Sequence, residues 1–547
     1  MTWWQHGVVY QIYPRSFQDN PEHPDGIGDL RGLIQRLDYL NDGSEQSLGV
    51  DAIWLSPFYP SPMADFGYDI SDYCAIDPLF GSMTDFDELL AAAHKRGIRI
   101  ILDLVVNHSS DQHPWFIESC DPHSDKADWY IWQSGSAEHP PNNWLACFGG
   151  RGWSWHPKRQ AWYFHSFLPQ QPDLNWRNPQ VQQAIRRVME FWLDKGVDGF
   201  RLDVVNLYFK DQQLNDNPTH IFKIARPYDR QHHMFDRDQP EMHSLLRQMR
   251  QWVDAYPDRM MVGEVMLADD ANSQLPASYY GNNDELHQAF NFEFLRCPFK
   301  ATAFRNVIAN WSRLLGDQNW PNYTLSNHDF VRHASRYTGV EKRFRSRAAK
   351  ADDQLRLKLL ATLLLTLRGT PYLYYGEEIA MPEQPVGRVH LRDPVGIRYW
   401  PLHPGRDGCR KPMMWDSSGQ EFSQAQHWLP HQPLAGINVE QQQRQPDSLL
   451  NWYKTLIWLR KKTPALHSGS LTLLDSHTDV LAYQRQTEHQ CVTVLLNFSG
   501  NTVALKTTLA SEPLIETQLS GTPLANTYPS FRPDYLLPYQ AVILTRD

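Results

Sequence analysis

The stretch GFRLDVVN, residues 199–206, places two charged side chains in a run that otherwise has the character of a buried β-strand. An unpaired buried charge is strongly unfavourable, so Arg201 and Asp203 are expected to serve a purpose at the end of that strand. Similar short apolar runs recur along the chain, each followed by a polar cluster and then by a helical pattern. This alternation predicts parallel strands that are connected by helices.

Eight strands of this kind are expected, at residues 8–13, 50–56, 98–106, 199–205, 260–265, 289–294, 323–326 and 371–375. Between them, Thr84 and Asn178 are predicted to cap the starts of two helices. Eight strand–helix units predict an α/β fold of the (β/α)8, or TIM barrel, type. The active site of such a barrel lies at the carboxyl ends of its strands.

Two segments interrupt the strand–helix repeat. Residues 107–171 are rich in Trp, His, Pro and Gly without a long helical pattern, which predicts a small inserted domain B after the third strand. Alternating apolar runs from about residue 467 predict a C-terminal antiparallel β-sandwich domain at 467–547. The barrel itself is then expected in two parts, at 1–106 and at 172–466.

Composition narrows the possible partners. A net charge of −10 argues against nucleic acid and against anionic membranes as partners. No apolar run reaches the roughly 18 residues of a membrane span and the N-terminus lacks a signal-peptide pattern, so a cytoplasmic location is expected. The chain has 20 Trp and 24 Tyr residues, more than packing needs, which suits a cleft that stacks flat ligands. The oligomeric state is left open.

Acidic and imidazole side chains stand at the ends of several predicted strands. The third strand ends in DLVVNH and the fourth in GFRLDVVN, while the fifth carries Glu264 and the seventh carries His328 and Asp329. A single acidic residue in such a place is usually a helix cap, but in a barrel these side chains would meet in one bowl. Paired carboxylates in a bowl with aromatic walls suit glycoside hydrolysis.

Asp203 and Glu264 are the predicted carboxylate pair. Arg201 lies two residues before Asp203, so on a strand both point to the same face, where the guanidinium would keep Asp203 ionised. A metal site is the chemical alternative, because Asp, Glu and His also bind metals. No HExxH or similar spacing accompanies these residues, and nearby arginines would oppose a cation.

The motifs DLVVNH, GFRLDVVN, GEV and SNHD resemble the four motif regions of the α-amylase superfamily of retaining α-glycoside hydrolases. GYDISDY at 67–73 and QPDLNW at 171–176 resemble the branch that holds α-glucosidases, oligo-1,6-glucosidases and sucrose isomerases. This resemblance implies an exo-acting α-glucosidase that releases glucose from the non-reducing end of small α-1,4- or α-1,6-linked oligosaccharides, with possible transglucosylation. It implies no cofactor for catalysis.

The resemblance also implies a role for each site residue. Asp203 would be the nucleophile, Glu264 the general acid/base and Asp329 a third carboxylate that binds the sugar hydroxyls. The implied substrate-binding residues are Asp65, Tyr68, His108, Phe148, Arg201, His328 and Arg406. Within that set Tyr68 would stack under the sugar ring, and Asp65 would pair with Arg406, which is favoured over Arg410. Core packing is the alternative for both Tyr68 and Phe148.

The first loop departs from the branch pattern. Related enzymes often carry DxNGDGIGD there, which holds Ca²⁺ or Mg²⁺, whereas this chain has the longer DNPEHPDGIGD at 19–29. Asp25, the carbonyl of Ile27 and Asp29 match the metal ligands of that pattern, and Asp19 is the candidate replacement for a missing one. A hydrogen-bonded turn without an ion is the alternative.

Two functional alternatives to this α-glucosidase remain. The first is a sucrose-acting glucosyltransferase, isomerase or hydrolase of the same fold, which differs from the α-glucosidase in the acceptor that takes the glucosyl group. The second is a non-catalytic relative, which would be expected to lack a carboxylate, whereas this chain keeps all three.

The residue after the predicted nucleophile bears on the linkage that is cleaved. Val204 resembles the residue found in α-1,6-cleaving enzymes, and strand alternation predicts that its side chain points away from the side that Asp203 faces.

Overall fold

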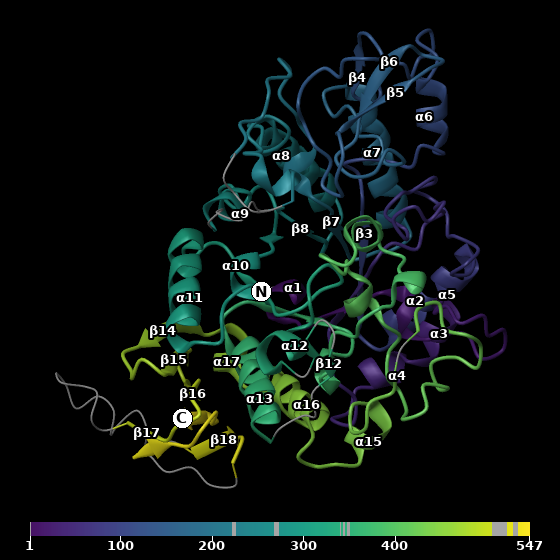
Figure 1. Cartoon of the computed structure of the whole chain (residues 1–547). Helices are drawn as coiled ribbons and strands as arrows, with labels where there is room; N and C mark the ends of the chain where they lie inside the picture. The colour runs from purple at the N-terminus through teal and green to yellow at the C-terminus, as the bar shows by residue number, and fades with distance from the viewer. Residues whose placement is uncertain are drawn as a thin grey trace.

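Eight parallel strands form the central sheet, in the order β10-β13-β1-β2-β3-β7-β8-β9 (Figure 1). The computed structural model describes residues 2–220, 226–266, 273–339, 341–342, 345–346, 351–430, 432–505, 522–528 and 534–546. The barrel strands are β1 (Val9–Ile12), β2 (Ala52–Leu55), β3 (Arg99–Leu104), β7 (Gly199–Leu202), β8 (Met260–Gly263), β9 (Gln288–Ala289), β10 (Asn322–Thr324) and β13 (Thr370–Tyr374). The predicted (β/α)8 barrel is therefore confirmed as a nearly closed barrel.

Helices surround this sheet. The helices described are α1 (Trp3–His6), α2 (Pro14–Phe17), α3 (Leu30–Gln35), α4 (Leu37–Leu40), α5 (Met83–Lys95), α6 (Pro114–Ser119), α7 (Pro179–Asp194), α8 (Glu241–Asp254), α9 (Gln274–Ser278), α10 (Phe292–Leu295), α11 (Ala301–Leu315), α12 (His333–Thr338), α13 (Ala351–Thr366), α14 (Pro394–Tyr399), α15 (Val439–Gln443), α16 (Leu449–Lys462) and α17 (Pro464–Ser468). Asn178 caps α7 as predicted, because its side chain accepts a hydrogen bond from the backbone of Gln180. The predicted cap Thr84 is wrong. Ser82 caps α5 instead and forms a capping box with Asp85.

The sixth strand is shorter than its apolar pattern predicts. The expected strand at 289–294 is only β9, and the residues after it form the short helix α10. Asn291 causes the change, because its side chain accepts hydrogen bonds from the backbone N–H groups of Glu293 and Phe294 and so starts a helix.

Smaller antiparallel sheets lie on two different sides of the barrel (Figure 1). After β3 the chain forms an antiparallel sheet in the order β4-β6-β5, made of β4 (Trp132–Ser134), β5 (Trp153–His156) and β6 (Ala161–Phe164). The C-terminal antiparallel sheet has the order β14-β15-β16-β20-β18, and a second small sheet pairs β17 with β19. These strands are β14 (Ser470–Leu474), β15 (Val480–Gln486), β16 (Cys491–Asn497), β17 (Val503–Ala504), β18 (Thr522–Asn526), β19 (Tyr535–Leu536) and β20 (Ala541–Arg546).

The predicted C-terminal domain includes residues 506–521, 529–533 and 547, which lie outside the described residues. The exact domain boundaries stay predictions.

Between 340 and 350, only the hairpin of β11 (Glu341–Lys342) and β12 (Arg345–Ser346) is described. Within the described part of the chain, every helix is too short or too polar to cross a membrane.

Candidate active site

A cavity of about 740 Å³ is lined by nine of the ten residues predicted to bind or transform a substrate. These are Asp65, Tyr68, His108, Phe148, Asp203, Glu264, His328, Asp329 and Arg406. They come together because the strands that precede them are parallel and end at the same side of the barrel. The tenth residue, Arg201, is only 1% exposed and binds the carboxylates that line the cavity.

Arg201 connects three carboxylates. Its Nη1 donates to Asp203 Oδ1 at 2.6 Å and to Asp103 Oδ1 at 2.7 Å, and its Nη2 donates to Glu264. The guanidinium carbon lies 5.1 Å from the centre of the Trp54 ring. One buried arginine therefore compensates the charge of the predicted pair, which explains why GFRLDVVN can carry charged residues in a buried strand.

Asp103 was not assigned a role from the sequence. The parallel register pairs Asp103 on β3 with Arg201 on β7, so the two side chains meet across neighbouring strands. Asp103 Oδ2 also accepts hydrogen bonds from Tyr68 at 3.1 Å and from Trp54 at 3.2 Å. Only the pairing of the strands identifies this partner. The sequence signal, an aspartate at the start of DLVVNH, does not show what it binds.

Tyr68 and His328 form a stacked pair at the base of the cavity. Their ring centroids are 5.3 Å apart with an interplanar angle of 6°, and Tyr68 Oη lies 2.5 Å from His328 Nε2. Gln11 Nε2 lies 2.8 Å from His328 Nδ1, and because an amide nitrogen only donates, Nδ1 accepts and Nε2 carries the proton. Burial lowers the pKa of His328 well below its usual value, so the imidazole is neutral. Gln11 was also missed from the sequence.

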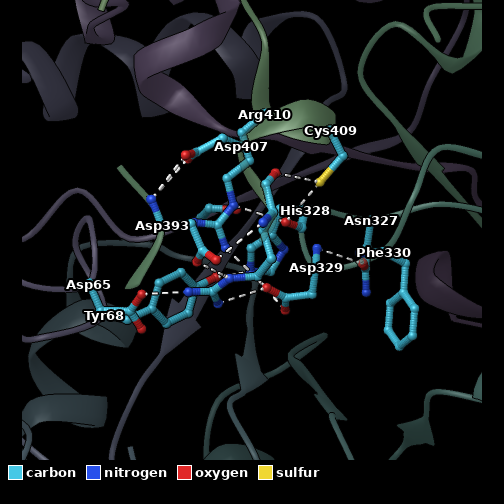
Figure 2. A network of polar contacts seen from close by, with 12 residues as sticks. Asp65, Tyr68, Asn327, His328, Asp329, Phe330, Asp393, Asp407, Cys409 and Arg410 are labelled. Carbon is cyan, nitrogen blue, oxygen red and sulfur yellow. Dashed lines mark hydrogen bonds and ion pairs between the residues drawn. The ribbon is translucent and has the colours of Figure 1, made fainter. Parts of the chain in front are cut away.

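Asp329 lies close to Arg410 (Figure 2) and also pairs with a second arginine, Arg406. Arg406 Nη1 and Arg410 Nη2 each lie 3.1 Å from Asp329 Oδ1, and the Arg406 guanidinium also binds Asp65 at 2.7 Å and Asp393 at 2.6 Å. The arginine that pairs with Asp65 is therefore Arg406. Arg410, the residue not favoured for that role, contacts Asp329 and the carbonyl oxygen of His328 instead.

His108 and Phe148 line the wall formed by the chain after β3. His108 Nε2 lies 3.0 Å from the carbonyl oxygen of Tyr68 and 3.1 Å from Gln171 Nε2, and burial lowers the pKa of His108 to about 4. The Phe148 ring packs against Phe167 at 5.3 Å, and the guanidinium carbon of Arg406 lies 4.8 Å from its centre. Both side chains are more than nine-tenths buried, yet both face the cavity.

The three predicted catalytic carboxyls differ in their affinity for protons. Burial raises the pKa of Asp203 and of Glu264 against the opposing charge of Arg201. Burial acts on Asp329 as well, but the charges of Arg406 and Arg410 outweigh it and hold the pKa of Asp329 below its usual value. A proton taken up by this group therefore resides on Asp203 or Glu264, while Asp329 stays ionised.

Val204 departs from the prediction. Strand β7 ends at Leu202, and Val204 adopts a left-handed backbone conformation with φ 37° and ψ 52°. This conformation is unfavourable for a β-branched residue. As a result the side chain faces the cavity and packs with Phe148, Phe167 and Val395, whereas strand alternation predicted that it would point away.

The first loop is held by hydrogen bonds to its aspartates. Asp19 Oδ2 accepts from the backbone N–H groups of Asp25 and Gly26 at 3.1 and 2.9 Å, and Asp29 Oδ1 accepts from Gly32 at 2.7 Å. Asp19 Oδ1 is buried and lacks a partner among the described residues, which fits a cation ligand. In those same residues, however, no three His, Cys, Asp or Glu side chains are grouped to hold an ion. The Ca²⁺ or Mg²⁺ site stays a prediction.

A thermal melt can test for this ion. Burial, with smaller contributions from Asp19 and Asp25, raises the pKa of Asp29 to about 6, so the stability provided by its protonated form is lost as the pH rises through that value. A bound divalent cation would offset this loss. We expect 5 mM Ca²⁺ or Mg²⁺ to raise the Tm by about 2 °C or more at pH 7.5 and by less at pH 5.

The matched control for the ion is the variant Asp25→Asn. It removes one predicted ligand charge and should abolish the rise in Tm that the ion causes. If the ion leaves the Tm of the wild-type protein unchanged at both pH values, the metal site is contradicted. The hydrogen-bonded turn without an ion would then be the correct description of this loop.

Comparisons with known proteins agree with this geometry. Residues 11–469 match the family described as alpha amylase, catalytic domain. The chain is 43% identical over 516 residues to a probable alpha-glucosidase of Rhizobium meliloti (strain 1021), covering 91% of this chain and 89% of the relative. It is 38% identical over 530 residues to the trehalose-6-phosphate hydrolase of Escherichia coli (strain K12), covering 91% of each.

Among solved structures, the chain resembles an alpha-glucosyl transfer enzyme with a TM-score of 0.88 and 38% identity, covering 100% of this chain and 99% of that one. The family match begins within β1 and runs through the rest of the barrel, including the insertion after β3. Sequence, fold and the arrangement of carboxylates around Arg201 lead to one conclusion: the chain belongs to the alpha-amylase family.

Proposed function

We propose that this protein is an exo-acting α-glucosidase that hydrolyses short α-glucosides with retention of configuration. The observation that carries the proposal is the pair Asp203 and Glu264, which share the Arg201 guanidinium inside one cavity, where burial raises the pKa of both. Retaining hydrolysis needs one ionised and one protonated carboxyl group. The similarity to a probable alpha-glucosidase supports the same function.

In this mechanism the carboxylate of Asp203 attacks the anomeric carbon while Glu264 donates its proton to the glycosidic oxygen. The bond to the leaving sugar breaks, and a covalent glucosyl-enzyme forms. Glu264, now ionised, takes a proton from a water molecule, whose oxygen displaces Asp203. Two inversions give overall retention. Asp329, which stays ionised, would accept hydrogen bonds from the sugar hydroxyls as the ring distorts.

The exo action rests on the ion pairs at one end of the cavity. Asp65, Arg406 and Asp329 form a continuous chain of charged contacts, and Asp393 anchors Arg406 from behind. Such a wall can bind the hydroxyls of a terminal glucose, and we infer that it stops a longer chain at this end. The proposed substrates are therefore short α-glucosides bound by their non-reducing end.

Initial rates on maltose, isomaltose, sucrose and trehalose test this function. Free glucose and transfer products should be counted separately, and ¹H NMR should identify the anomer released first. We expect α-glucose as the initial product and hydrolysis of at least one α-linked disaccharide. β-Glucose as the first product would contradict the mechanism. If the transfer products exceed the free glucose, the result would favour the transferase alternative. The similarity to an alpha-glucosyl transfer enzyme is the observation that supports this alternative.

The pH dependence follows from the two carboxyls. Asp203 must be ionised and Glu264 protonated, so kcat/KM should be bell-shaped, and its acid limb should fall as Asp203 becomes protonated. Burial raises the pKa of both groups, which should shift both limbs above the range of exposed carboxyls. Profiles on maltose between about pH 4 and pH 9 test this. A flat profile would exclude Asp203 and Glu264 as the catalytic pair.

Val204 should influence the choice of linkage. Its side chain faces the cavity beside Phe148, so a change there alters a wall contact worth about 1 to 3 kcal/mol. We expect the wild-type protein to accept isomaltose at least as well as maltose, and Val204→Thr to shift the ratio of kcat/KM toward maltose. The control is Val503→Thr in strand β17 of the small two-stranded sheet, which should leave the ratio unchanged. An unaltered ratio in Val204→Thr would assign Val204 to packing alone.

A further inference from the structure

Arg237 is a buried arginine with no hydrogen bond to its side chain among the described residues. It is 3% exposed and lines the same cavity as the carboxylates. Its closest anionic neighbour is Asp238, whose Oδ2 lies 3.6 Å from Arg237 Nε, too far for a hydrogen bond, and Nε has no partner. A buried guanidinium has five N–H donors, and leaving them unpaired is costly. Its place in the cavity wall makes a ligand the natural partner.

Asp238 is held firmly beside it. The residue has φ 59°, and its backbone N–H donates to the carbonyl oxygen of Asn206 at 2.8 Å. The Asn206 amide donates to Asp238 Oδ1 at 2.7 Å. With Oδ1 engaged in this way, Oδ2 remains on the side of Arg237, and the carboxylate is 31% exposed to the cavity. The wall therefore presents a fixed donor and a fixed acceptor next to each other.

Asn206 also places this pair relative to the predicted acid/base. Its side chain accepts from Met266 N at 2.8 Å and donates to Met266 O at 2.9 Å, and Met266 follows Glu264 by two residues. An acid that protonates the glycosidic oxygen stands between the glucose and the leaving sugar. The far end of the cavity, at Asp65 and Arg406, takes the glucose. Through Asn206, Arg237 and Asp238 are therefore held on the side of Glu264 where the leaving sugar lies.

We propose that Arg237 and Asp238 bind the leaving sugar, with the guanidinium donating to one hydroxyl and the carboxylate accepting from its neighbour, so that the site selects neutral sugars. This inference rests on the proposed α-glucosidase function and names the class of its leaving group. A sugar hydroxyl both donates and accepts, so adjacent hydroxyls match an adjacent donor and acceptor.

The charges immediately beside Arg237 favour a neutral sugar over a phosphorylated one. Asp238 balances Arg237, and the nearby His233 is paired with Asp236 at 2.7 Å. A phosphate placed against Arg237 would also face the Asp238 carboxylate, and like charges at close range repel. The protein should therefore differ from the trehalose-6-phosphate hydrolase that it resembles in the leaving sugar that it accepts.

The test compares substrates with and without a leaving sugar. α-Glucosyl fluoride needs only the glucose side of the cavity, whereas maltose and isomaltose also need the site for the leaving sugar. Arg237→Met keeps an unbranched apolar side chain but removes the guanidinium and its donors. We expect kcat/KM on both disaccharides to fall about 10- to 100-fold, since a hydrogen bond to a charged group is lost, and kcat/KM on α-glucosyl fluoride to change less than about twofold.

Asp238→Asn should show the same selective loss in a smaller degree, and it serves as the second variant if Arg237→Met is poorly folded. Arg186→Met, which removes an exposed arginine paired with Glu190 on α7, should leave all three substrates unaffected. Equal losses on the fluoride and the disaccharides would overturn the inference. So would a wild-type kcat/KM that is higher on trehalose 6-phosphate than on maltose. If the wild-type protein cleaved neither the fluoride nor a disaccharide, the proposed function itself would fail.

Discussion

Asp203→Asn is expected to lower kcat on maltose by about 10³-fold or more, because the amide cannot form the covalent glucosyl intermediate at a useful rate. The fold should survive the change. Arg201 keeps its contacts with Asp103 and Glu264, and the substitution removes one negative charge from a buried group of carboxylates. We expect the Tm of the variant to equal or exceed that of the wild-type protein, measured by circular dichroism.

The matched control is Asp475→Asn, the same chemical change at a residue whose side chain is 91% exposed. It should keep full activity. A residual kcat above one tenth of the wild-type value in Asp203→Asn would refute the assignment of the nucleophile. Mass spectrometry adds a direct readout, since a slow fluorinated glucoside should label the wild-type protein at Asp203 and leave the variant unlabelled.

Glu264→Gln is expected to have the second largest effect, and its size should depend on the leaving group. On maltose, whose leaving oxygen needs a proton, kcat/KM should fall by about 10² to 10⁴-fold. On α-glucosyl fluoride, whose leaving group needs far less protonation, the loss in the first step should be much smaller. The variant should also lose the alkaline limb of the pH profile, because that limb reports the ionisation of Glu264.

Glu488→Gln provides the control for this variant, because Glu488 is 89% exposed in the C-terminal sheet region. It should preserve both the rates and the pH profile. Equal losses on maltose and on α-glucosyl fluoride would show that Glu264 supports the site without donating a proton. A variant that retained the alkaline limb would assign that limb to another group.

The amino-acid sequence was enough to predict the elements and the acidic residues of the site. The apolar runs separated by helical patterns specify eight strands and their order along the chain, since the type of an element depends mainly on nearby residues. A residue just after a barrel strand must lie at the carboxyl end of the sheet. Asp203, Glu264 and Asp329 could therefore be expected in one bowl before their distances were known.

Local patterns were insufficient where a nearby polar residue or the backbone overrode them. Asn291 ends the sixth strand early by capping a helix, and Ser82 rather than Thr84 starts α5, because in each case a side-chain oxygen satisfies free backbone N–H groups. Val204 faces the cavity because the chain leaves the strand in a left-handed conformation that no periodic pattern predicts.

The tertiary structure alone decided which side chains meet. Asp103 binds Arg201 through the register of two strands, and Gln11 orients His328 from across the barrel. Neither contact can be deduced from spacing, because each joins residues about 100 or more positions apart. The donor–acceptor pair of Arg237 and Asp238 likewise becomes visible only when Asn206 connects it to the loop after Glu264. Sequence determines the elements through local energetics, whereas the closure of the barrel and the packing of its loops determine these partners.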